Sequence, residues 1–320
     1  MRTIVHVVRT SVLICTFAFA TFFSNAQSIT SPNGKFEIGL GLGPMMFLGD
    51  LGGNTGVGTT FVKDVNFPVL NLQKGLFLNY YPQEWLGFRL AANHSVLEGA
   101  DSLIKEKGGA ETYRYVRNLH FRSTLLEAYA GVEIYPTVFF EQYEGLQGKV
   151  RPYGLIGIGL FKFKPQTQYY SPNGTASWVD LEPLRIEGQG MAEYPDRPRY
   201  KTTAMEIPVG GGVKWYVKDN MYLGIELLHR KTFTDYVDDL SKDYIDPALY
   251  DKYLTPENAV IARQVQDRKL GGTTLGSAPT FIGEQRGNPK NNDSFFSTII
   301  RFGWRLFDNS DAAGMGCPKW

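Results

Sequence analysis

Eight segments of this chain alternate apolar residues with polar or glycine residues at every second position. Side chains of a β-strand point alternately to the two faces of its sheet, so each segment predicts a strand with one apolar face. No run of 18 apolar residues and no long helical periodicity competes with this pattern. We therefore expect an all-β protein, an eight-stranded antiparallel transmembrane β-barrel. The segments are 35–48, 67–81, 84–97, 119–136, 150–164, 201–217, 220–235 and 293–307.

The connections between these segments alternate in length. Segments two and three join through Pro82-Gln83, segments six and seven join through Lys218-Asp219, and 137–149 is of moderate length. Short turns at one rim and long loops at the other are typical of outer-membrane barrels, which keep the short turns in the periplasm and the long loops outside the cell. The four longer connections are 49–66, 98–118, 165–200 and 236–292.

The two faces of the predicted strands differ in kind. In the seventh segment Leu223 and Ile225 share one face, while Tyr222 and Glu226 share the other. A soluble barrel, such as a lipocalin, would turn the apolar face inward. Glycines, however, fall on the charged face, and glycine is expected where the narrow interior of an eight-stranded barrel leaves little space. We therefore expect the charged face inside and the apolar face on lipid.

Charged residues on the inner face must find partners, because an isolated buried charge is very costly. Positive and negative side chains there are balanced, which predicts an interior ion-pair network that fills the lumen. A path for protons or ions along the same residues is the alternative. The expected members are Glu37, Arg89, Glu127, Glu133, Glu206, Lys214, Glu226, Arg230, Arg301 and Arg305.

The start of the chain is typical of an exported protein. Arg2 and Arg9 form a positive start before an apolar stretch at 11–23, and Ser24-Asn25-Ala26 predicts cleavage before Gln27. We divide the chain into a signal peptide, 1–26, an outer-membrane β-barrel, 27–307, and a short C-terminal tail, 308–320. The expected location is the cell outer membrane. Cleavage would leave Cys317 as the one cysteine, so no internal disulfide is expected.

Signals for catalysis or cofactor binding are weak. The 33 Lys+Arg nearly balance the 32 Asp+Glu, which argues against a nucleic-acid partner. His94, His120 and His229 have no metal-ligand spacing. His94-Ser95 resembles the pair of barrel lipid hydrolases, but neighbours on a strand point to opposite faces. The glycine-rich stretch 52–58 lacks the ending of a phosphate-binding loop. We predict no enzyme activity, no cofactor, no metal and no small-molecule substrate.

The last long connection contains two features. Five aspartates between residues 235 and 246 predict a solvated acidic run rather than a calcium loop, whose ligands are spaced more closely. Thr255-Pro256-Glu257 predicts a helix start, and Gly271 a possible end. Ile261 and Val265 share one face of that helix. We expect it to cover the barrel mouth or to meet a partner.

Several stretches resemble a known family. Arg151–Gly159 and Ile207–Lys214 are strand-like matches. Two further stretches are more specific, Glu187-Gly188-Gln189-Gly190 and Arg230-Lys231-Thr232-Phe233-Thr234-Asp235-Tyr236. Together with Glu37-Ile38-Gly39, these pieces span most of the predicted mature chain. On them the chain resembles the Bacteroidota outer-membrane β-barrel family (DUF6089) that includes PorG of the type IX secretion system.

The resemblance implies a non-enzymatic part of the type IX secretion machinery that anchors or aligns its periplasmic ring. The implied partners are outer-membrane lipid and periplasmic ring proteins. An eight-stranded barrel is too narrow to pass folded cargo, which agrees with a supporting role. A small outer-membrane adhesin or structural barrel that binds partners through extracellular loops is the alternative, and a lipid-modifying barrel enzyme is a third possibility.

A periplasmic contact would use the surfaces that remain on the short-turn side. Consecutive aromatics on an exposed turn indicate a partner or an aromatic girdle at the lipid headgroups. The candidate surfaces are residues 27–34, the turn 137–149 with Phe139, Phe140 and Tyr143, and the tail 308–320 with Cys317 and Trp320.

Overall fold

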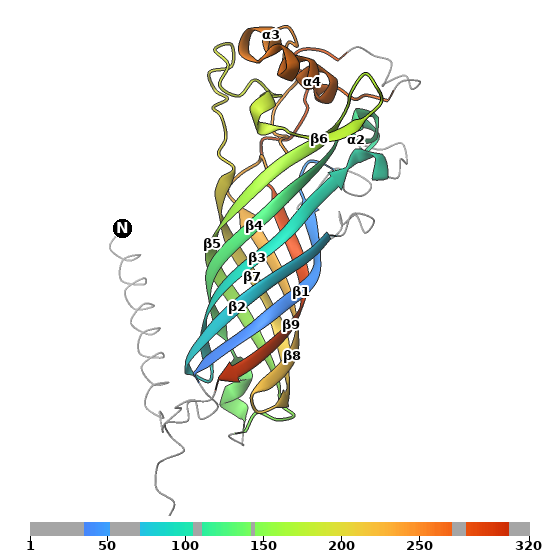
Figure 1. Cartoon of the computed structure of the whole chain (residues 1–320). Helices are drawn as coiled ribbons and strands as arrows, with labels where there is room; N and C mark the ends of the chain where they lie inside the picture. The colour runs from blue at the N-terminus through green and yellow to red at the C-terminus, as the bar shows by residue number, and fades with distance from the viewer. Residues whose placement is uncertain (1–34, 52–70, 105–110, 142–144, 271–279, 307–320) are drawn as a thin grey trace, which may run out of the picture.

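The computed structural model describes residues 35–51, 71–104, 111–141, 145–270 and 280–306. Eight antiparallel strands pair in chain order and close into a barrel where β9 meets β1, with Leu40 opposite Phe302 (Figure 1). This confirms the predicted fold class. The barrel strands are β1 (Phe36–Leu48), β2 (Asn71–Gln83), β3 (Leu86–Ala100), β4 (His120–Ile134), β5 (Val150–Tyr170), β7 (Thr203–Lys218), β8 (Met221–Thr232) and β9 (Ser294–Leu306).

The alternation of apolar and polar residues along each strand corresponds to an alternation of exposed and buried side chains. In β8, Leu223 and Ile225 are exposed on the outside, whereas Tyr222 and Glu226 are buried inside. The other barrel strands repeat this arrangement, so an apolar belt surrounds a polar interior. That distribution suits a barrel wall in contact with lipid and is the reverse of the soluble arrangement. The fold is therefore that of a transmembrane β-barrel.

Glycines on the inner face make room for aromatic rings. A Cβ atom added at Gly303 in β9 would lie 2.1 Å from the ring of Tyr222, and one at Gly39 in β1 would lie 2.3 Å from the ring of Phe77. No side chain can occupy such positions unless the ring moves. Scarce space inside a narrow barrel thus accounts for the glycines on this face.

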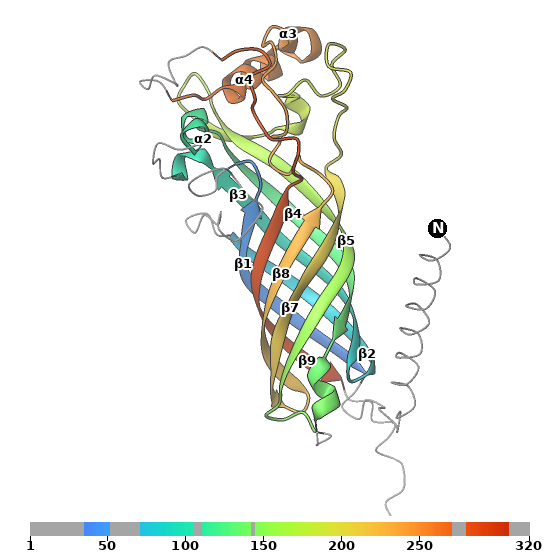
Figure 2. The same cartoon turned by 180° about the vertical axis from the view of Figure 1, so that it is seen from behind.

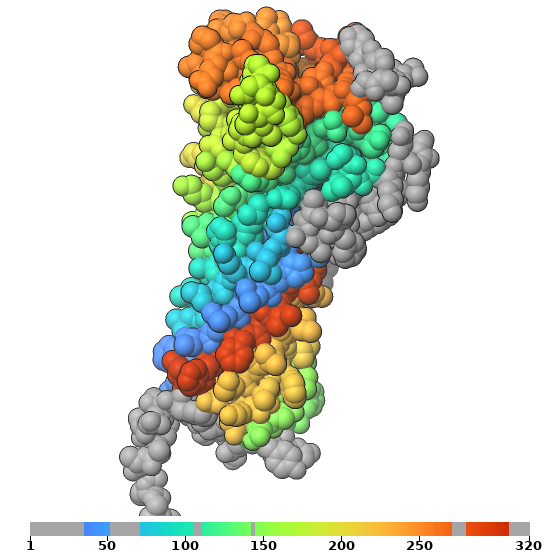
Figure 3. All heavy atoms as spheres, turned by 45° about the vertical axis from the view of Figure 1, so that its right-hand side comes forward, coloured from blue at the N-terminus to red at the C-terminus, as the bar shows by residue number. Residues whose placement is uncertain are grey.

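The two rims of the barrel differ in structure. At the short-turn rim, residues 84–85 join β2 to β3, residues 219–220 join β7 to β8, and the connection from β4 to β5 contains the 3-10 helix η4 (Pro136–Phe140). At the other rim, the long-loop rim, the connections fold into a continuous mass over the barrel end (Figures 2 and 3). We call its described parts, within 101–117, 171–200 and 233–293, the cap.

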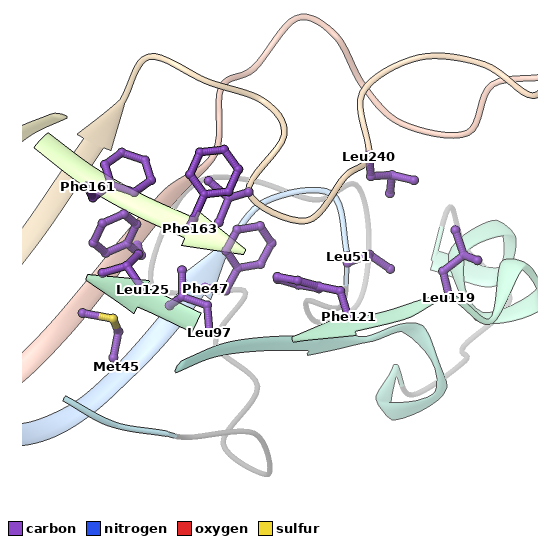
Figure 4. Packing of buried hydrophobic residues seen from close by; sticks show 12 residues of the cluster. Met45, Phe47, Leu51, Leu97, Leu119, Phe121, Leu125, Phe161, Phe163 and Leu240 are labelled. Carbon is purple, nitrogen blue, oxygen red and sulfur yellow. The ribbon is translucent and has the colours of Figure 1, made fainter. Parts of the chain in front are cut away.

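The cap has its own secondary structure and its own apolar core. Val265 of α4 is buried there with Tyr250 of α3 and Ile186. A second apolar cluster, which includes Phe47, Phe121 and Leu240, fills the barrel mouth below the cap (Figure 4). The cap is therefore a packed unit continuous with the barrel. Its elements are η3 (Asp101–Leu103), α2 (Glu111–Arg117), β6 (Ala176–Asp180), η5 (Glu182–Leu184), α3 (Leu249–Tyr253) and α4 (Pro256–Gln266).

The predicted loop 165–200 is wrong in its first part. Strand β5 continues to Tyr170 and turns back into β6 (Ala176–Asp180), so that Gln166 lies opposite Asp180. The continuation, Gln166 to Tyr170, is polar on both faces because it stands beyond the apolar belt. Without an apolar face it lacks the alternation from which the other strands were predicted.

The predicted helix start in the last connection is confirmed. The Thr255 side chain accepts a hydrogen bond from the Asn258 amide, and Pro256 opens α4. The helix ends at Gln266, before Gly271, because Asp267 is already extended. Among the described residues, no helix is long and apolar enough to cross a membrane.

Candidate functional site: a filled lumen beneath a folded cap

The lower lumen, nearest the short-turn rim, is built around Glu37. Its carboxylate lies 2.8 Å from the Lys214 ammonium and accepts hydrogen bonds from the hydroxyls of Tyr81 at 3.0 Å and Tyr222 at 2.9 Å. Lys214 also lies 3.6 Å from Glu133. All these groups are fully buried or nearly so. One carboxylate and one ammonium thereby connect five strands, β1, β2, β4, β7 and β8.

Glu226 occupies the middle of the lumen. It pairs with Arg89 at 2.5 Å and also with Arg301, and the Tyr153 hydroxyl donates to it at 2.6 Å. Arg89 makes a second ion pair with Glu133, which connects the middle layer to the lower one. One carboxylate thus bridges two guanidinium groups, from β3 and β9, and Glu133 supplies a second carboxylate to Arg89.

The upper lumen contains Arg230 and Glu127. The guanidinium binds both carboxylate oxygens, at 3.0 and 3.1 Å, and also Gln73 at 3.1 Å. Asn93 donates to the same carboxylate at 3.0 Å. A buried charge that is paired and hydrogen-bonded in this way can be kept in a dry interior.

The structure brings nine of the ten predicted lumen residues into ion pairs with one another or with Glu84. The tenth, Glu206, is buried close to Gly159, and neither carboxylate oxygen has a hydrogen-bond partner among the described residues. The ion-paired residues are Glu37, Arg89, Glu127, Glu133, Lys214, Glu226, Arg230, Arg301 and Arg305.

Sequence reasoning missed a layer at the short-turn rim. Glu84 pairs with Arg151 at 2.5 Å and with Arg305 at 2.8 Å, and Arg151 also pairs with Glu141 at 2.7 Å. Glu84 falls in the predicted segment 84–97, but it lies in the turn before β3, where alternation no longer holds, and Glu141 follows η4 outside any strand. Arg151 was open to prediction, because it precedes Tyr153 by two positions in a strand and both point inward.

The Glu-Gly-Gln-Gly stretch ties the cap together. The Glu187 carboxylate accepts hydrogen bonds from the backbone amide of Lys242 at 2.8 Å and from Arg286 at 2.9 Å. Gly188 and Gly190 have φ of +81° and +70°, which favour glycine. Gln189 accepts a hydrogen bond from the amide of Glu187 at 3.1 Å. This motif therefore connects the cap segment 171–200 to the cap segment 233–293.

The second specific stretch, 230–236, carries the chain from the lumen into the cap. Arg230 belongs to the lumen network, and the Thr232 hydroxyl donates to the carbonyl of Asp293 at 2.6 Å. Lys231 and Phe233 point outward and are exposed. Tyr236 stacks on Tyr200 with ring centroids 4.6 Å apart.

The prediction that the acidic run is solvated is wrong for its first three aspartates. Asp235, Asp238 and Asp239 are buried, because the cap folds over them. Asp238 accepts the Leu240 amide at 3.0 Å, as a turn former does. Burial raises the pKa of Asp235 to about 8 and that of Asp239 to about 7. Among the described residues, no three acidic, histidine or cysteine side chains lie close enough together to hold a metal ion.

The histidines are dispersed. His94 points outward and is half-buried, whereas Ser95 points inward and donates to the sulfur of Met45 at 2.8 Å. His120 meets Arg268 at 3.0 Å near the cap, and His229 lies on the outside of β8. No catalytic set is assembled around a histidine within the described residues.

Two aromatics mark the short-turn rim. Phe139 is 60% exposed, with its ring 5.9 Å from that of Trp85, and Phe140 is 84% exposed.

The remaining predicted features lie outside the described residues: the signal peptide 1–26, residues 27–34, the stretch 52–58, Tyr143, and the tail 308–320 with Cys317 and Trp320.

No family model matches the chain, and no curated protein matches it in sequence. Solved barrels with a related fold include Ail, the attachment invasion locus protein of Yersinia pestis, 10% identical over 85% of this chain and 97% of that one, TM-score 0.33. Neisserial surface protein A is 8% identical over 85% and 97%, TM-score 0.35. OprG of Pseudomonas aeruginosa is 10% identical over 86% and 97%, TM-score 0.37. The fold assignment rests on this chain's own strand pairing and burial.

Proposed function

We propose that this protein is an outer-membrane barrel that acts by contact, neither conducting solutes nor catalysing a reaction. The observation that carries the proposal is the filled lumen. Ion pairs and tyrosines occupy its lower, middle and upper levels, and the apolar cluster with Phe47 and Phe121 closes its mouth. A lumen filled in this way leaves the outer surfaces for function.

The partner we propose is the periplasmic ring of the type IX secretion machinery, which the barrel would anchor or align. The resemblance of the stretches 187–190 and 230–236 supports this assignment. The short-turn rim would make the contact, since Phe139 and Phe140 are exposed there and large exposed aromatics commonly mark interfaces.

The cap supports a second candidate, an adhesin or structural barrel that binds an extracellular partner. The cap exposes Phe281 and Ile282, 65% and 63% accessible, in a turn with Gly283 at φ +83°. Adjacent exposed apolar side chains on a packed unit favour a contact with a partner there.

Two matched pairs of apolar residues at opposite rims separate these candidates. One variant replaces Phe139 and Phe140 with serine, and the other replaces Phe281 and Ile282 with serine. Barrel assembly is checked by migration of unboiled samples on a denaturing gel. Crosslinked outer membranes are then captured, and periplasmic ring proteins and secreted cargo are measured. The anchor role predicts loss of both in the first variant only. Normal levels in the first variant, with loss of an extracellular binding activity in the second, would overturn it.

A further inference from the structure

A lysine stands within the apolar belt on the outside of the barrel. Lys74 of β2 is exposed on the outer face, and its neighbours on that face, Leu72 and Leu76, are 61% and 62% exposed. Within the described part of the chain Lys74 forms no ion pair and no side-chain hydrogen bond. A cation on a lipid-facing surface is costly, and an anionic partner beside it would reduce that cost.

A second nitrogen donor lies directly beside this lysine. His94 of β3 is the register partner of Lys74 and points to the same face. Its imidazole ring is half-buried on that face. Across the next strand, His94 pairs with Leu126 and Leu126 pairs with Lys162, which is also exposed. Cationic and hydrogen-bonding groups thus form one row over β2, β3 and β5.

Below this row the barrel wall is hollowed. A depression of about 380 Å³ has Lys74 and His94 at its border and Leu42, Ala92 and Leu126 among its walls. It shares Leu40, Leu76 and Ala92 with a second depression of about 590 Å³ that reaches Phe302 and Trp304. The wall with β1 in blue and β9 in red faces the viewer in Figure 3.

Two small outward residues, Ala92 and its register partner Ala128, lie among large ones at this groove. Ala92 is the outward residue of β3 between Leu90 and His94, and its register partners are Leu76 and Ala128. The alanine leaves a space that the leucines border. The resulting surface has a polar end at Lys74 and His94 and an apolar length below it.

We propose that this wall binds one anionic lipid, with its phosphate on Lys74 and His94 and an acyl chain in the groove over Ala92. The lysine ammonium can reach toward the headgroup level while its methylene chain stays on the apolar wall. A protein strand could not add here, because β2 is paired on both sides, by β1 and β3. A free phosphate would leave the apolar groove uncovered.

Native mass spectrometry of the full barrel in detergent tests this proposal. The probes are dioleoyl phosphatidic acid and dioleoyl phosphatidylcholine, which share acyl chains and differ in headgroup. We expect one retained phosphatidic acid per barrel and weak retention of phosphatidylcholine. Lys74→Gln should weaken phosphatidic acid binding about ten-fold, the effect of losing one charge-assisted hydrogen bond. Ala92→Phe, which fills the groove, should weaken it as well.

Lys231→Gln is the matched control. Lys231 is also an exposed outward lysine without an ion pair among the described residues, but it lies on β8, away from the groove. Binding should be unchanged in this variant, and inorganic phosphate should not displace the lipid. Equal losses for Lys74→Gln and Lys231→Gln, equal binding of the two lipids, or unchanged binding in Ala92→Phe would each overturn the proposal. Heat-dependent gel migration verifies that every variant is assembled.

Discussion

At the scale of single residues, Glu226 is a lumen carboxylate that pairs with two buried arginines. Glu226→Ala leaves Arg89 and Arg301 buried without this shared carboxylate. Removing one partner of a buried pair costs about 3–5 kcal/mol, because an uncompensated charge remains. We expect the free energy of unfolding in vesicles to fall by that amount in urea titrations. Asp180→Asn is the control, since it breaks an exposed pair with Lys164 and should cost about 1 kcal/mol or less. Similar losses in both variants would contradict a dry, ion-paired lumen.

Which residues face the lumen follows from alternation along each strand, but which of them pair does not. Glu37 and Lys214 are 177 positions apart. Their contact depends on how far neighbouring strands are displaced as the barrel closes, and a one-residue change of register would turn a whole strand over. For the same reason, the sequence did not indicate which tyrosines hydrogen-bond to Glu37. The sequence was therefore sufficient to predict which residues point inward, but not which residues they pair with.

At the scale of elements, the cap should respond to pH through its buried aspartates. Burial raises the pKa of Asp235 from 3.8 to about 8. The folded cap thus holds a proton that the unfolded chain releases, so stability from this group is complete below pH 3.8 and is lost as pH rises through about 8. Hydrogen-exchange protection factors of the cap should fall about ten-fold or more between about pH 5 and about pH 9.

Two aspartate variants test this response. Asp235→Asn should reduce the fall, because the amide carries no charge at any pH, and the part that remains belongs to the other buried aspartates, such as Asp239, whose pKa burial raises to about 7. Asp251→Asn, at an exposed position of α3, should leave it unchanged. Protection that rises with pH in the wild type would show that the sign is wrong. The burial of Asp235 could not be read from the sequence, since acidic residues between strands are usually solvated and only the folded cap covers this one.

At the scale of the whole molecule, the barrel is a closed wall with an occupied interior and one enlarged end. Outward residues form an exposed apolar belt, inward residues bind one another, and the cap covers the mouth. The eight barrel strands and both rims were predictable because each depends on local alternation and loop length. The β5–β6 hairpin was not predictable, because it extends beyond the apolar belt. It therefore lacks the apolar face from which the other strands were predicted.

Single-channel recording in planar bilayers tests the central claim, that this barrel acts by contact and does not conduct. The purified full-length barrel is incorporated, and its insertion is verified separately by protease protection. The filled lumen predicts no conductance steps above the background of the bilayer at any applied voltage. A Glu226→Ala barrel that still inserts serves as the comparison, because it lacks the central carboxylate. Stable, stepwise openings of the wild-type barrel would contradict the account.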